Sequence, residues 1–210
     1  MMRPSLLPLF PLLLLAACAT PEAAAPQPGL ATATAAPAAA APAAARPAID
    51  FPATLGSFQR RGEVTDYGAA SGLGRAAGYH RANGDYATVY LYDRRQRRAP
   101  EGAMSPDVAA ELQVTRQELD GVMALGRYRA VEPADPELLV ERTRSGGPGL
   151  RCNNYRITQT HGGTTGDAVC VTVLDGQFLK VRSTAANGDP RRANLIGAEL
   201  ILAMQEAARR

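Results

Sequence analysis

Few residues of this chain have the types and spacing that chemistry requires. The two histidines, His80 and His161, lack the HExxH spacing that brings two imidazoles to one metal ion. No serine stands in a Gly-x-Ser-x-Gly nucleophile turn, and Ser145 lies in a glycine-rich stretch typical of a turn. Gly72 to Ala77 matches the letters of the dinucleotide pattern GxGxxA, but we expect a strand after it, where that site needs a helix. The sequence therefore predicts no catalytic residue, no cofactor and no metal.

Tyrosines and arginines gather on both sides of Asn83-Gly84, a dipeptide typical of a two-residue hairpin turn. Such a turn would place Arg81 opposite Tyr86, Tyr79 opposite Thr88, Ala77 opposite Tyr90 and Arg75 opposite Tyr92. Because Tyr and Arg are enriched at recognition surfaces, this face is a binding candidate, and the alternative is that a helix covers it. The predicted binding residues are Arg75, Tyr79, Arg81, Tyr86, Tyr90 and Tyr92.

A dense basic run follows this hairpin and comprises Arg94, Arg95, Arg97 and Arg98. It predicts contact with an anionic component, namely a phospholipid headgroup, a polyanionic glycan or an acidic protein face, and the alternative is a solvated loop. The formal net charge of the whole chain is only +3, from 23 basic and 20 acidic residues. This balance predicts no nucleic-acid partner.

The first residues, 1–17, are typical of a signal peptide, because an uncharged apolar run from Leu6 to Ala17 follows Arg3. The run is shorter than the roughly 20 residues of a membrane-spanning helix. Its end, Leu15-Ala16-Ala17-Cys18, resembles the lipobox of bacterial lipoproteins. The resemblance implies that the peptide is removed and that Cys18 becomes an acylated N-terminus. Because Ala19 follows and not Asp, it also implies an outer-membrane anchor that faces the periplasm.

Residues 18–48 are predicted to be a lipidated tether. Between Ala19 and Ala48 the chain has 16 alanines and 6 prolines in 30 residues, so it can neither build a core nor sustain a helix. Residues 49–210 then form a single folded domain. In an exported, oxidising compartment, Cys152 and Cys170 are expected to form a disulfide, and His161 alone is too little for a zinc site.

The elements that position these residues alternate between hairpins and helices. A second two-residue turn at Asp175-Gly176 joins Ala168–Leu174 to Gln177–Arg182, and Arg151–Thr160 reads as a further strand. Helices are expected to begin at Ser105-Pro106-Asp107 and at Asp189-Pro190. The fold class is therefore α+β, an antiparallel sheet of hairpins that carries two main helices. The order of elements loosely resembles the αβα sandwich of PsbP-type proteins.

These patterns predict a lipid-anchored periplasmic protein that binds an envelope component without catalysis. The alternative is a small periplasmic hydrolase or ligand-modifying enzyme whose site is spread over loops. A deep pocket with convergent polar groups would favour the enzyme, and an exposed face of aromatic and basic residues would favour binding.

Overall fold

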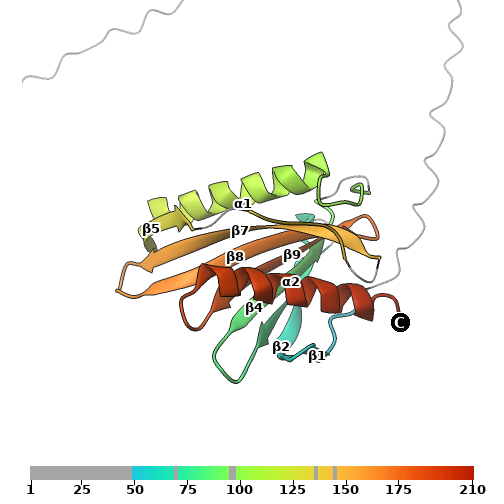
Figure 1. Ribbon diagram of the computed structural model, residues 1–210, viewed down its shortest axis with the longest axis horizontal. Helices are drawn as coiled ribbons and strands as arrows, with labels where there is room; N and C mark the ends of the chain where they lie inside the picture. Colours follow the sequence, from blue (N-terminus) through green and yellow to red (C-terminus); the bar gives the residue numbers. More distant parts are fainter. Residues whose placement is uncertain (1–48, 69–70, 95–97, 135–136, 144–145) are drawn as a thin grey trace, which may run out of the picture. The chain divides into compact units, whose positions relative to one another are not determined.

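The computed structural model describes residues 49–68, 71–94, 98–134, 137–143 and 146–210, which form nine strands and two helices (Figure 1). The strands are β1 (Thr54–Leu55), β2 (Phe58–Asp66), β3 (Arg75–His80), β4 (Tyr86–Tyr92), β5 (Tyr128–Pro133), β6 (Leu138–Arg142), β7 (Pro148–Gln159), β8 (Thr164–Leu174) and β9 (Gln177–Ala185). The helices are α1 (Pro106–Ala124) and α2 (Pro190–Ala207). The predicted signal peptide, Cys18 and the tether lie outside the described residues. Within them, no helix is long and apolar enough to cross a membrane.

The strands form one antiparallel sheet in the order β1-β2-β3-β4-β9-β8-β7-β5, and β6 also pairs with β7. β8 and β9 are joined by the two residues Asp175 and Gly176, both with positive φ, so Leu174 pairs directly with Gln177. This is the tight turn that the sequence predicts. Together with the two helices, the sheet confirms the α+β class.

The two helices pack on opposite faces of the sheet. Neighbouring residues of a strand point to opposite sides, so one strand can contact both helices. Along β8, Ala168 and Cys170 belong to the hydrophobic cluster that contains residues of α2, whereas Val169 and Val171 belong to the cluster that contains residues of α1. Every member of the two clusters lies at or after Ile49, which is itself buried. The compact unit Arg46–Arg210 therefore holds the whole described core and is expected to fold without the preceding residues.

Both helices begin where the sequence predicts. The hydroxyl of Ser105 accepts a hydrogen bond from the Asp107 amide, and the carboxylate of Asp189 accepts one from the Arg191 amide. A proline follows each cap and suits the first helical turn, since it has no amide proton to leave unpaired.

Cys152 and Cys170 form the predicted disulfide between β7 and β8, where they are direct cross-strand partners. Both cysteines are fully buried beneath α2. The helix approaches the disulfide at Gly197, where a Cβ atom would lie 2.5 Å from the Cys170 sulfur. A glycine at this position therefore sets how closely α2 can pack on the sheet.

The predicted two-residue turn at Asn83-Gly84 is wrong, and so is the register derived from it. The Arg81 amide donates to the Asp85 carbonyl at 2.9 Å, which closes a loop of three residues, and Gly84 supplies the positive φ (90°) that this loop type needs. Arg75 consequently pairs with Leu91, and Tyr79 with Ala87.

This shift of one residue moves every β3 side chain to the other face of the sheet relative to β4. The cause is tertiary, because the Asp85 carboxylate is drawn towards α2. It accepts hydrogen bonds from the Ala186 amide at 2.9 Å and from Arg192 at 2.7 Å.

Candidate functional site

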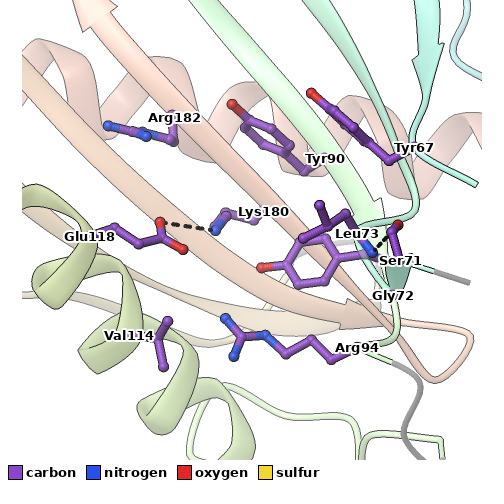
Figure 2. A pocket seen from close by; sticks show the side chains of 11 residues that line it. Tyr67, Ser71, Gly72, Leu73, Tyr90, Arg94, Val114, Glu118, Lys180 and Arg182 are labelled. Carbon is purple, nitrogen blue, oxygen red and sulfur yellow. Dashed lines mark hydrogen bonds and ion pairs between the residues drawn. The ribbon is translucent and has the colours of Figure 1, made fainter. Parts of the chain in front are cut away.

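A pocket of about 740 Å³ opens between α1 and the sheet, on the face that α1 covers only in part. Among the described elements, α1 packs mainly over β5, β7 and β8 and covers the part of this face formed by β4 and β9 less closely. The side chains that line the pocket are drawn in Figure 2. They belong to Tyr67, Ser71, Gly72, Leu73, Tyr90, Tyr92, Arg94, Val114, Glu118, Lys180 and Arg182.

A buried carboxylate, Glu111 of α1, organises the inner end of the pocket. Its Oε1 accepts hydrogen bonds from the Tyr92 hydroxyl at 2.5 Å and from the Lys180 ammonium at 3.2 Å. Its Oε2 forms an ion pair with Arg94 at 2.7 Å. The Glu111 side chain is only 1% exposed. Three partners, two from the end of β4 and one from β9, therefore satisfy a charge that would be costly to bury alone.

Lys180 is the single lysine of the chain, and its ammonium lies on the floor of the pocket. The Nζ atom lies 5.6 Å from the ring centre of Tyr90 and 5.3 Å from that of Tyr92. A second carboxylate, Glu118, approaches it at 3.8 Å from the solvent side. Two aromatic faces and two carboxylates thus hold this cation in place.

The pKa values of Tyr90 and Tyr92 are both raised in the pocket. Burial raises the pKa of Tyr92 far above its ordinary value, and the adjacent Glu111 carboxylate raises it further. Burial also raises the pKa of Tyr90. The Tyr92 hydroxyl donates its proton to the Glu111 carboxylate in a hydrogen bond.

The segment before β3 forms the outer wall of the pocket. Tyr67 and Leu73 are 45% and 58% exposed, although both are large apolar side chains. The Ser71 hydroxyl donates to the Gly68 carbonyl and accepts from the Leu73 amide, which fixes the turn. The mouth of the pocket therefore presents apolar surface to solvent beside a charged floor.

Three of the predicted binding residues lie on the other face of the sheet and contact their own chain. Arg75 donates to the Ile49 carbonyl at 2.6 Å, and Tyr79 is buried and donates to the Pro52 carbonyl at 2.9 Å. Arg81 forms an ion pair with Glu199 of α2 at 2.5 Å. The prediction that these three share a face with the β4 tyrosines is wrong, because the register differs by one residue.

The β4 tyrosines do share a face of the sheet, but their surroundings differ. Tyr90 lines the pocket, Tyr92 is buried against Glu111, and Tyr86 is 54% exposed at the far end of the strand. In the basic run, Arg94 is paired with Glu111, and Arg98 donates to the Asp175 carbonyl. Arg95 and Arg97 lie outside the described residues. A binding role for these residues stays a prediction.

Among the charged residues in and around the pocket, Arg94 is one of the predicted binding residues. The sequence analysis does not identify the others, which are Glu111, Glu118, Lys180 and Arg182. Glu111 and Glu118 directly precede the buried Leu112 and Leu119 of α1, so they border its apolar stripe. Along β9, Lys180 and Arg182 alternate with apolar residues and therefore share the face of the buried Phe178. These two patterns could have marked the pocket, but the sequence does not show that the two segments meet.

Other candidate chemistry finds little support. Gly72 lines the pocket, and the strand β3, not a helix, follows the glycine-rich segment. Within the described residues, no group of three or more His, Cys, Asp or Glu side chains could hold a metal ion. Comparison with protein-family models and with the sequences of curated proteins finds no match.

Proposed function

We propose that this chain is a lipid-anchored protein of the bacterial envelope that binds a small ligand in the pocket between α1 and the β4–β9 surface. The resemblance of Leu15–Cys18 to a lipobox supports the lipid anchor, and Ala19 in place of Asp supports the outer membrane, facing the periplasm. The alanine- and proline-rich residues 18–48 would allow the domain to meet its ligand away from the membrane.

The observation that carries this proposal is a pocket that combines an apolar mouth with a fixed charged floor. Ligand sites are typically apolar clefts of 300–1,000 Å³ with a few precisely placed polar groups, and the pocket of about 740 Å³ lies within that range. Its polar groups are held in position before any ligand arrives, because Glu111 links Tyr92, Lys180 and Arg94. Such preorganisation lowers the cost of binding.

Binding is favoured over catalysis because the groups that could act as acid, base or nucleophile are tied to one another. The Ser71 hydroxyl is engaged in its own turn. The Lys180 ammonium is held between Glu111 and Glu118. The arrangement therefore supports recognition more directly than a reaction.

A fluorescence titration with 1-anilinonaphthalene-8-sulfonate tests this proposal on the chain Arg46–Arg210. We expect one dye molecule to bind per chain. In the variant Val114→Trp a large ring enters the pocket from α1, so dye affinity should fall about 10-fold or more. Leu202→Trp adds the same ring on the outer face of α2, where Leu202 is 38% exposed, and should leave the affinity unchanged.

The single lysine locates the bound dye. Selective 13C-lysine labelling gives one Cε signal, from Lys180, and we expect this signal to shift as the dye saturates. Dye binding that leaves the Lys180 signal unmoved, or that survives Val114→Trp unchanged, would contradict the proposal.

A further inference from the structure

We infer that the pocket takes a small apolar molecule that bears one carboxylate, with the carboxylate beside Arg182 and Lys180. This inference rests on the proposed function, because it names the ligand class of the same site.

The first argument is the charge balance of the pocket. Arg94 and Lys180 are matched by Glu111 and Glu118 through ion pairs, whereas Arg182 makes no ion pair and no side-chain hydrogen bond within the described residues. Among the described residues that line the pocket and their ion-pair partners, one positive charge is thus in excess. A guanidinium pairs well with a planar carboxylate through two parallel hydrogen bonds, so a single carboxylate would restore the balance.

The second argument concerns the aromatic rings on the floor. Rings of tyrosine attract cations, but the rings of Tyr90 and Tyr92 already face the ammonium of Lys180. A cationic ligand would have to approach this ammonium and the free Arg182. An anionic ligand would instead be attracted by both of these cations.

The third argument is that the two cationic side chains of β9 lie beside an apolar wall of the pocket. Lys180 and Arg182 are two residues apart on β9, so their side chains leave the sheet on the same side. Figure 2 shows Lys180 among the labelled side chains, with Glu118 and Val114 on the α1 side and Tyr67 and Leu73 on the opposite wall. An inorganic anion would leave this apolar wall in water. A molecule with an apolar body would cover it and gain hydrophobic free energy.

A matched pair of probes tests the inference: 11-(dansylamino)undecanoic acid and its methyl ester, which differ only by the carboxylate charge. Fluorescence titrations use the chain Arg46–Arg210, its variant Arg182→Gln, and the control Arg129→Gln. The control removes the same charge from an exposed position on β5. Because no described acidic side chain forms an ion pair with Arg182, Arg182→Gln leaves no such partner unpaired and should fold normally.

We expect the parent and Arg129→Gln to bind the acid about 10-fold more tightly than the ester, as a charge-assisted hydrogen bond predicts. In Arg182→Gln this preference should fall to about 3-fold or less, with ester affinity unchanged. Equal binding of acid and ester by the parent, or an acid preference that Arg182→Gln retains, would overturn the inference.

The proposed pocket function would still stand if Val114→Trp removed binding of 1-anilinonaphthalene-8-sulfonate. Binding of neither probe also overturns the inference, and the anilinonaphthalene titration then decides the function separately.

Discussion

Lys180 of β9 and Glu111 of α1 form an ion pair across the interface between sheet and helix, with Nζ 3.2 Å from Oε1. Their side chains are 9% and 1% exposed, although 69 residues separate them in the chain. The pair joins α1 to the floor of the pocket. It therefore links the stability of the domain to the shape of its candidate site.

Removal of the two partners should have unequal effects on stability. Glu111→Leu leaves Lys180, Arg94 and the Tyr92 hydroxyl without their shared acceptor and should lower the free energy of unfolding by about 3 kcal/mol. Lys180→Met leaves Glu111 held by Arg94 and Tyr92 and should cost about 1 kcal/mol. Urea unfolding measures both. A greater loss in Lys180→Met would contradict the central role of Glu111.

Asp85 should make the domain sensitive to acid. Burial raises the pKa of Asp85, but hydrogen bonds from Arg192, the Ala186 amide and Asn83 outweigh burial and lower the pKa from 3.8 to about 2. A carboxylate whose pKa is lower in the folded state contributes stability above the unfolded value, and this contribution is lost as pH falls from about 4 to about 2.

The loss over this pH window should be on the order of 1–2 kcal/mol, since the partner Arg192 is partly exposed. Asp85→Asn should be less stable at pH 7 and should lack this part of the pH dependence. Unfolding curves for both chains between pH 2.5 and 7 provide the comparison. If the free energies of unfolding of the two chains differed by the same amount at every pH, Asp85 would not titrate as described.

The packing of α2 on the disulfide can be tested with two glycine variants. Gly197→Ala places a methyl group 2.5 Å from the Cys170 sulfur and should lower stability by roughly 1–3 kcal/mol. Gly121→Ala is the matched control in α1, where a Cβ would meet nothing within 4 Å, and it should raise stability by about 0.5–1 kcal/mol. Thermal unfolding of both variants distinguishes them by the sign of the change in stability. If Gly197→Ala left the stability unchanged, α2 would be able to shift away from the disulfide without loss of stability.

The proposed lipid anchor depends on one thiol. Cys18→Ser removes the acceptor of the acyl chains, so we expect an unprocessed or soluble form in place of the membrane-bound one. Membrane fractionation of the two chains, with globomycin treatment of the parent, gives the readout. Normal cleavage and full membrane retention of the Cys18→Ser chain would rule out lipidation at this residue.

Local signals in the sequence determined where the helices begin and where the second hairpin turns. Ser105-Pro106-Asp107 and Asp189-Pro190 cap their own first turns, and Asp175-Gly176 adopts the positive φ values of a tight turn. These features depend on residues only a few positions apart, so the sequence suffices to predict them. Cys152 and Cys170, which are 18 residues apart, pair across the neighbouring strands β7 and β8.

The tertiary structure alone decided which residues share a face and which meet in the pocket. A strand alternates its side chains with a period of two, so one extra loop residue before Asp85 was enough to separate Arg75 and Tyr79 from Tyr90. The pocket exists because α1 packs over β5, β7 and β8 and leaves β4 and β9 partly open. That placement follows from contacts between distant segments, among them the pair of Lys180 and Glu111, and no local pattern in the chain encodes it.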